Sequence, residues 1–303
     1  MKKSFIISSP CHLSIRDEQL VITRKDPPDT FTRFIEDIGI LVLEHQQITI
    51  TLPVLQQLAH HNVTVVVCDK NHLPISMSWP MDVHHTHGLR VRQQLESSEP
   101  LRKNLWKQTI EAKILNQAEA LASLGLETGP LRTWAKEVQS GDATHREGIS
   151  ARYYFQTMYG KDWNRHPEGE PPNQWLNYAY TLIRASMSRA LTGAGLLPVV
   201  GIQHQNKYNS YPLADDIMEP YRPFADLQVY GMYRQYGGEM TDINTYQKQT
   251  LFQILTADTL YRGQKSPLQV SMENVAANLA QCYAGVTRKL EYPKVIYAPA
   301  SPI

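Results

Sequence analysis

The spacing of apolar residues changes along the chain, and this change constrains the fold more than any other feature. In the first 80 or so residues, short apolar runs such as GILVLE and VTVVVC alternate with polar turns, which is typical of β-strands. From about residue 100, apolar residues recur at helical spacing, as at Leu101, Leu105, Ile110 and Ile114. This order predicts an α+β protein with a small β-rich N-terminal domain followed by a larger all-α C-terminal domain.

The pattern divides the chain into a β-rich domain over residues 1–80, a linker over 81–90 and a helical domain over 91–303. Within the first domain, HLSI and LVIT predict a hairpin, and LPVLQQLAHHN predicts a single helix. In the second domain, Asp142 is the predicted N-cap of one helix and Ser271 opens the last. The helices are expected over 100–126, 129–140, 141–160, 174–195, 213–237 and 271–290.

Composition excludes several classes of protein. With 303 residues, 42% of them apolar, the chain can bury a full core, and a net charge of +1 gives no bulk tendency to bind nucleic acid. Any basic surface must therefore be local. Three widely spaced cysteines, Cys11, Cys68 and Cys282, form no disulfide framework. No apolar run is long enough for a signal peptide or a membrane span, so we expect a cytoplasmic protein without membrane contacts.

Three carboxylates are concentrated in the segment PLADDIMEPYRP. Asp215 and Asp216 fall at a helix start, where acids favour the helix dipole. That explanation leaves out Glu219, which lies four and three residues later and can reach the same side of the helix. Like charges at this spacing repel unless they share a cation. Pro220 has no N–H, so we expect the helix to kink there.

Two further residues are candidate ligands. Glu147 lies in EGISARYYF among apolar and aromatic residues, and His204 follows an apolar stretch in GIQHQN. Taken singly, each has an ordinary alternative: a surface glutamate paired with an arginine, and a hydrogen-bonded structural histidine. Together, carboxylate oxygens and one imidazole predict a Mg²⁺ or Mn²⁺ site. A separate metal site at HHTHG, from His84, His85 and His87, is a weaker alternative because no fourth ligand is evident.

Several motifs in this order resemble one protein family. EGISARYYF, LNYAYTLIRASMSRALTGAGLLPVVGIQH and LADDIMEPYRP, with LWKQTIEAKILNQA upstream, resemble CRISPR-associated protein one, the integrase that captures new spacers. The resemblance covers nearly the whole chain, and DIMEPYRP is similar to the branch found in type II systems. It implies that the helical domain is catalytic and the β-rich domain mediates dimerisation and partner contacts.

The resemblance also implies a metal site of a glutamate, a histidine and a third carboxylate. Carried over by motif, these are Glu147, His204 and Glu219, with Asp216 as a second-tier residue near the metal. Arg152 and Arg222 follow the proposed ligands at short spacing, and we expect them to contact DNA phosphates. Asp215 is assigned mainly to helix-start electrostatics.

The reaction that the resemblance implies is insertion of short prespacer duplexes into a CRISPR repeat array by attack of a DNA 3′-hydroxyl on a phosphodiester. The implied partners are double-stranded DNA, a second copy of the chain, and the small CRISPR-associated protein two bridging two dimers. The type II effector nuclease and a ring-shaped DNA-end-binding protein are further expected partners. Two alternatives stay open: a metal-dependent phosphodiesterase that hydrolyses nucleic acid, and a non-catalytic DNA-binding scaffold.

Overall fold

Short strands and one helix make up the N-terminal part of the protein. The computed structural model describes residues 2–70, 74–78, 80, 84–166, 169, 171–204, 207–237 and 243–296. The N-terminal elements are β1 (Lys3–Ile7), β2 (His12–Arg16), β3 (Gln19–Lys25), β4 (Pro28–Phe34), β5 (Ile38–Leu43), β6 (Thr49–Ile50), α1 (Leu52–His60), β7 (Thr64–Cys68) and β8 (Pro74–Ser78).

The N-terminal strands form two sheets. The first has the order β1-β5-β7-β8, with β1, β5 and β7 parallel and β8 antiparallel at the edge. The second has the order β4-β3-β2-β6, and the predicted hairpin is its β2–β3 pair. β5 is a continuous apolar run buried on both faces, which suits a parallel strand covered on two sides. Ile40 and Val42 belong to the core of the helical part, whereas Leu41 belongs to the core within the N-terminal part.

Helices dominate the rest of the chain. They are α2 (His87–Leu95), α3 (Glu99–Ser123), α4 (Leu131–Lys136), α5 (Arg146–Tyr159), α6 (Asn173–Gly193), α7 (Pro212–Met218), α8 (Arg222–Tyr236), α9 (Thr245–Phe252) and α10 (Leu268–Tyr283). Short 3₁₀ turns cover Ile35–Asp37, Ser140–Asp142, Glu219–Tyr221 and Gln253–Thr256. Among the described residues, no helix is long and apolar enough to cross a membrane.

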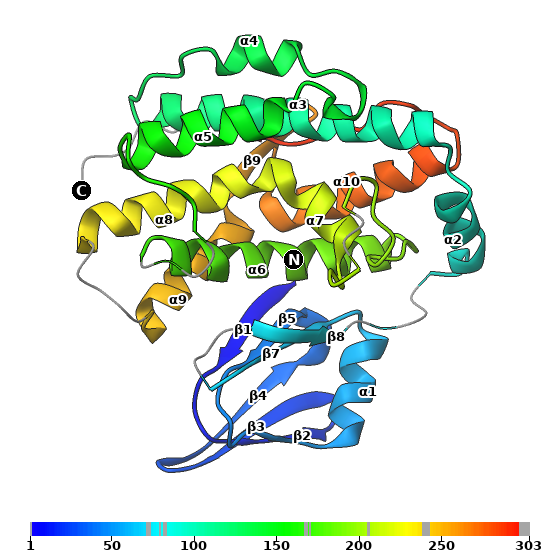
Figure 1. The fold of residues 1–303 in the computed structure, drawn as a ribbon. Helices are drawn as coiled ribbons and strands as arrows, with labels where there is room; N and C mark the ends of the chain where they lie inside the picture. The colour runs from blue at the N-terminus through cyan, green and yellow to red at the C-terminus, as the bar shows by residue number, and fades with distance from the viewer. Residues whose placement is uncertain are drawn as a thin grey trace.

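The long helix α6 lies between the N-terminal sheets and the helices α3, α5 and α8 (Figure 1). It contacts β5 and β7 on one side and α7, α8 and α10 on the others, and most of its residues are buried, including Trp175 and Tyr178. α3 and α5 run together on the far side of the molecule from the sheets. A core that runs from β5 through α6 to α3 holds the elements that carry the candidate site.

The α+β class, with N-terminal sheets and a helical C-terminal part, is confirmed. The expectation of an all-α second part was wrong in one respect, because β9 (Asp258–Tyr261), β10 (Gln264–Pro267) and β11 (Lys294–Val295) form a small sheet of order β10-β9-β11. These strands are short and partly polar, so they carry too little alternation for sequence to indicate them.

Three local expectations also need correction. α2 begins at His87, inside the predicted linker 81–90; Gly88 in its first turn hides the helical pattern. Residues 81–83 of that linker lie outside the described residues, and the domain boundaries stay predictions. α10 begins at Leu268 rather than Ser271, whose hydroxyl donates to the Leu268 carbonyl instead of capping. β1 and β4 were not predicted, β4 because it is mostly exposed.

Candidate functional site

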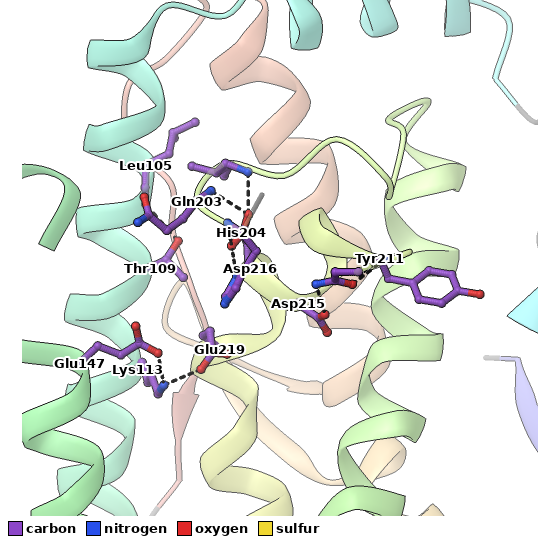
Figure 2. Close-up of polar contacts among 12 residues, drawn as sticks. Leu105, Thr109, Lys113, Glu147, Gln203, His204, Tyr211, Asp215, Asp216 and Glu219 are labelled. Carbon is purple, nitrogen blue, oxygen red and sulfur yellow. Dashed lines mark hydrogen bonds and ion pairs between the residues drawn. The ribbon is translucent and has the colours of Figure 1, made fainter. Parts of the chain in front are cut away.

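One lysine joins two of the predicted ligands. Lys113 of α3 places its Nζ atom 2.8 Å from Glu147 Oε1 and 2.5 Å from Glu219 Oε2 (Figure 2). Lys113 and Glu219 are buried, whereas the Glu147 side chain is 32% exposed. Two carboxylates that are far apart in sequence therefore pair with the same ammonium group.

Glu147 is placed by the start of α5. His145, in the left-handed region at φ 53°, is the residue before the helix and makes no side-chain cap. The cap comes from Asp142, whose two carboxylate oxygens accept the N–H groups of Arg146 at 2.9 Å and Glu147 at 3.1 Å. The predicted capping function of Asp142 is thus present, but it acts from further upstream, and it fixes the first turn that carries Glu147.

Glu219 is placed by a break in the helix. α7 ends at Met218 and α8 begins at Arg222, and the 3₁₀ turn between them contains Pro220, as expected from its missing N–H. Asn116 of α3 donates its Nδ2 hydrogen to the Pro220 carbonyl at 2.8 Å. The break therefore points Glu219 at α3, where Lys113 lies one turn from Asn116.

Glu219 is kept ionised despite its burial. Burial favours the neutral acid, but the charges of Arg222 and Lys113 outweigh it and lower the pKa of Glu219 to about 2. Arg222 donates from Nε to Glu219 Oε1 at 2.8 Å and lies over the Tyr180 ring, 4.4 Å from its centroid. Burial also opposes the charge on Lys113, yet Glu219 and Glu147 raise its pKa above the ordinary value. Glu219 and Lys113 are therefore both charged at neutral pH.

His204 is held by Asp216. The carboxylate of Asp216 accepts the backbone N–H groups of Ile202, Gln203 and His204, at 2.6, 3.0 and 3.2 Å, and lies 2.5 Å from His204 Nδ1. With Nδ1–H donating to Asp216 Oδ1, Nε2 of the neutral imidazole keeps a lone pair that can bind a metal ion. The hydrogen bond that His204 donates to Asp216 raises the pKa of His204 against the lowering effect of burial, and the charges of Asp216 and Glu219 add to the rise.

The loop around Asp216 leaves no room for a side chain at Gly201. A Cβ atom there would lie 2.5 Å from the His204 carbonyl oxygen and 3.0 Å from Asp216 Oδ2. Glycine is therefore required where the backbone wraps the carboxylate. Trp106 of α3 packs edge-on against the His204 ring at 5.7 Å between centroids, so the imidazole is fixed from two sides.

Asp215 serves a different purpose from its neighbours. Arg184 of α6 donates from Nε to Asp215 Oδ1 at 2.6 Å, and Asn209 donates to Oδ2 at 2.9 Å. It faces α6 and the loop rather than Lys113, as Figure 2 shows. Ion pairing to α6, in addition to its place in the first turn of α7, accounts for this acid.

A cavity of about 220 Å³ adjoins the cluster. Its lining includes Lys113, Glu147, Glu219, Arg165, Tyr180 and Asp226. The Tyr180 hydroxyl donates to Asp226 Oδ1 at 2.5 Å. Burial raises the pKa of Asp226 to about 7, against the lowering effect of that hydrogen bond. An acid that changes charge near neutral pH thus lies beside the proposed ligands.

The structure brings the sequence-predicted residues together only in part. Glu147 meets Glu219 through Lys113, and His204 meets Asp216, but within the described ranges no three His, Cys, Asp or Glu side chains are close enough to hold a metal ion as placed. Both Asp216 oxygens are engaged by the loop. The cation that lies between Glu147 and Glu219 is the Lys113 ammonium.

The predicted DNA contacts and the alternative histidine site have distinct surroundings. Arg152 is exposed on α5, whereas Arg222 is the ion-pair partner of Glu219; their contacts with DNA stay predictions.

At HHTHG, His84 Nδ1 accepts from the Thr86 N–H at 3.2 Å, and His87 Nδ1 lies 3.2 Å from the Gly195 carbonyl oxygen. His84 thus stabilises the entry to α2 locally, and His87 links α2 to the chain that follows α6.

Sequence reasoning missed Lys113, Asp226 and Asn116. A signal was available for Lys113, because Thr109, Lys113, Asn116 and Gln117 lie among the apolar residues of α3 at helical spacing and all are buried. A lysine inside an apolar stripe indicates a buried counter-charge. Asp226 sits one turn beyond Arg222 on α8 and has no comparable signal.

Comparison with known proteins identifies the family. The family model described as CRISPR associated protein Cas1 matches residues 5–259. The chain belongs to the Cas1 family. It is 34% identical over 300 residues to the CRISPR-associated endonuclease Cas1 of Neisseria meningitidis serogroup C (strain 8013), covering 97% of this chain and 96% of that protein. The family resemblance seen in the motifs is thereby confirmed; the type II branch stays a prediction.

Two solved structures share the fold. A casposase bound to integration product superposes with a TM-score of 0.83 at 20% identity, covering 99% of this chain and 96% of that one. A chain of a Cas6-RT-Cas1–Cas2 complex gives a TM-score of 0.75 at 17% identity, covering 96% of this chain and 36% of that one. At these identities the likeness concerns the fold, which extends over nearly all of this Cas1 family member.

Proposed function

We propose that this Cas1 family protein is a metal-dependent DNA integrase of CRISPR adaptation, with Glu147, His204 and Glu219 as its metal ligands. The observation that carries the proposal is the convergence of Glu147 and Glu219 on one cation, Lys113 Nζ, and His204 supports it because Asp216 holds its imidazole at Nδ1. Family membership and the relatives named endonuclease and casposase support the same reaction class.

The donor set fits a divalent ion such as Mg²⁺ or Mn²⁺. Carboxylate oxygens are the ligands that both ions prefer, and Mn²⁺ also accepts imidazole. Glu219 is ionised and buried, and His204 offers Nε2 because Asp216 takes Nδ1. A carboxylate behind a ligating histidine is the usual outer support of such sites. Asp216 would therefore act as a positioning residue.

The chemistry needs little covalent participation from the protein. A divalent ion at these residues supplies positive charge at the scissile phosphate and lowers the pKa of the attacking 3′-hydroxyl. Arg222 keeps Glu219 ionised and fixed, and Asp142 keeps the turn that carries Glu147 in place. Arg165 and Lys113 line the adjoining cavity and add positive charge where phosphate groups approach.

DNA and protein partners follow from the same proposal. The net charge of +1 gives weak attraction for DNA overall, so binding relies on local cations such as Arg152 and on assembly. A homodimer, with two dimers joined by the small Cas2 protein, is the proposed assembly; the fold relative in a Cas6-RT-Cas1–Cas2 complex supports a Cas2 partner. The type II effector nuclease and a DNA-end-binding ring protein are further proposed partners.

Strand transfer is the test. Purified protein, with and without its Cas2 partner, is mixed with a labelled duplex bearing 3′-hydroxyls and a supercoiled plasmid carrying the repeat, in Mn²⁺ or Mg²⁺. We expect label to join the plasmid, to be blocked by EDTA and to be lost in Glu147→Ala. Glu119→Ala is the matched control, because Glu119 pairs with Arg132 on the surface at 3.0 Å, away from the site. Full joining by Glu147→Ala would overturn the metal assignment.

Hydrolysis is the second candidate reaction, favoured by the name endonuclease of the Neisseria relative. The same ligands would then activate water in place of a DNA hydroxyl. The plasmid assay separates the two, because cleavage without joined label indicates hydrolysis. Tight duplex binding with neither product, under either metal, would instead favour a DNA-binding scaffold.

A further inference from the structure

Lys113 occupies the point at which the two proposed carboxylate ligands converge. Its side chain is 8% exposed, and its Nζ atom contacts Glu147 and Glu219 at 2.8 and 2.5 Å (Figure 2). We propose that Lys113 is a positioning residue that holds these carboxylates together in the metal-free protein, yields its place to the divalent ion, and then pairs with a DNA phosphate. The inference rests on the proposed function and deepens it.

Competition follows from the oxygens of Glu219. Its Oε1 atom takes Arg222 and its Oε2 atom takes Lys113, so each carboxylate oxygen already has a cation. A metal ion that binds Oε2 between Glu147 and Glu219 therefore meets the Lys113 ammonium at the same place. Two cations cannot share one oxygen at ion-pair distance in a buried site without strong repulsion.

Lys113 is the cation able to withdraw. The guanidinium of Arg222 is planar, lies over the Tyr180 ring at 4.4 Å and donates from Nε in a fixed direction. Lys113 instead carries a compact ammonium on a flexible four-carbon stem. It also lines the cavity of about 220 Å³ shared with Arg165 and Asp226, which gives the ammonium space to move without entering the core.

Charge balance then couples metal binding to DNA binding. Before metal binds, the two carboxylates are balanced by Lys113 and Arg222. The neighbouring charge on Asp216 is already matched by three backbone N–H groups and His204. A divalent ion therefore leaves an excess of two positive charges, and a DNA phosphate paired with the released ammonium offsets one of them. By linkage, DNA must strengthen metal binding by the same factor as metal strengthens DNA binding.

Replacing Lys113 with a neutral residue should strengthen Mn²⁺ binding, whereas a substitution that only disturbs the fold of the site should weaken it. In Lys113→Met the competitor for Glu147 and Glu219 is gone, and the two carboxylates repel, so Mn²⁺ should bind about tenfold more tightly without DNA. The strengthening of Mn²⁺ binding by DNA should shrink, and strand transfer should fall. A residue that only supports the fold would weaken metal binding or leave it unchanged.

The experiment is a calorimetric titration of Mn²⁺ into metal-free protein, with and without a short duplex. The heat of Mn²⁺ binding to the duplex alone is subtracted. Wild type is compared with Lys113→Met, Lys113→Gln, Lys113→Arg and Glu147→Gln. Lys107→Met is the control, since Lys107 is on the same helix but pairs with Glu111 at 3.5 Å on an exposed face. We expect tighter binding and weaker coupling in Lys113→Met and Lys113→Gln, and near wild-type values in Lys107→Met. Lys113→Arg should bind Mn²⁺ no more tightly than wild type, because a planar guanidinium still occupies the carboxylates and withdraws less readily than an ammonium.

The outcomes separate the inference from the proposed function. If wild-type protein binds no Mn²⁺, or if Glu147→Gln does not weaken the binding, the proposed metal site is wrong. If Glu147→Gln does weaken Mn²⁺ binding, the metal site stands. Competition by Lys113 is then overturned if the neutral Lys113 variants bind Mn²⁺ no more tightly than wild type, or if they keep the full coupling to DNA. Lys113→Gln decides where Lys113→Met fails to fold, because its amide can still donate to one of the carboxylates.

Discussion

Lys248 Nζ lies 3.0 Å from Glu44 Oε1, and this ion pair is buried where the sheets meet the helices. The side chains are 5% and 1% exposed. Glu44 follows β5, Lys248 is on α9, and the Tyr178 hydroxyl of α6 donates to the same Glu44 oxygen at 3.2 Å. Three elements from both parts of the chain thus meet at one buried carboxylate, which fixes how the N-terminal sheet sits on α6.

Replacing only one partner of this ion pair should lower the stability of the protein. Lys248→Met leaves the Glu44 charge buried without a cation, so we expect the free energy of unfolding to fall by about 3–5 kcal/mol. The double variant Glu44→Gln/Lys248→Met should lose less, because no charge is then left unpaired. Urea unfolding at pH 7 measures both. Lys265→Met is the control, since its pair with Asp258 is exposed and 3.7 Å long, and it should change stability by less than about 1 kcal/mol. Equal effects of Lys248→Met and Lys265→Met would contradict this account.

The pair of His204 with Asp216 predicts a pH dependence in the metal-free protein. The pKa of His204 is raised from 6.5 in the folded state, chiefly by the Asp216 hydrogen bond. Its contribution to stability is therefore full below about pH 6.5 and is lost as pH rises through the raised pKa. The stability difference between wild type and His204→Gln should shrink over that range, as measured by urea unfolding at several pH values.

Metal binding should show the opposite trend with pH. A proton on His204 Nε2 competes with the ion for the same lone pair, so the affinity for Mn²⁺ should rise as pH passes through the raised pKa. His12→Gln is the control, because His12 is on β2 and its ring contacts Thr49 at the surface. A Mn²⁺ affinity that falls with pH, or a flat profile in wild type, would remove His204 from the proposed ligands.

The sequence predicted those parts of the site in which a charged residue lies in surroundings that are unusual for it. Glu147 among apolar residues and Glu219 beyond the needs of a helix start both indicated buried charge, and the structure places both at Lys113. His204 was a candidate from its place after an apolar stretch, but a single histidine in a loop is more often structural, and the resemblance to a family assigned it to the metal site. The α+β class followed from the change in apolar spacing.

The rest of the site depends on contacts that a linear pattern does not encode. The apolar stripe of α3 indicates that Lys113 is buried, but its partners follow only once α5 and the turn after α7 pack against α3. The role of Asp216 depends on a loop in which three backbone N–H groups point at one carboxylate. β9 and β10 pair as a hairpin across the turn at Arg262 and Gly263, and β11 joins β9 from beyond α10.

Asp226 predicts a second dependence of stability on pH. Burial raises its folded-state pKa from 3.8 to about 7. Its contribution is full below about pH 3.8 and is lost as pH rises through about 7, since the charged form is then buried. Asp226→Asn keeps an acceptor for Tyr180 but cannot ionise, so its stability relative to wild type should increase between about pH 5 and pH 8. Urea unfolding at both pH values tests this, with the exposed Asp258→Asn as control. An unchanged difference would show that Asp226 keeps an ordinary pKa.

The acids of PLADDIMEPYRP should separate by function when each is neutralised. Glu219→Gln removes a proposed ligand that faces Lys113, so we expect strand transfer to fall by at least about 100-fold. Asp215→Asn weakens bonds to Arg184 and Asn209 on the other side of α7, so the free energy of unfolding should fall by about 1–3 kcal/mol while strand transfer per folded molecule stays within about threefold. Initial rates of strand transfer and urea midpoints are measured on the same preparations. A folded Asp215→Asn protein as inactive as Glu219→Gln would mean that Asp215 also acts at the metal, and its assignment to α6 would be wrong.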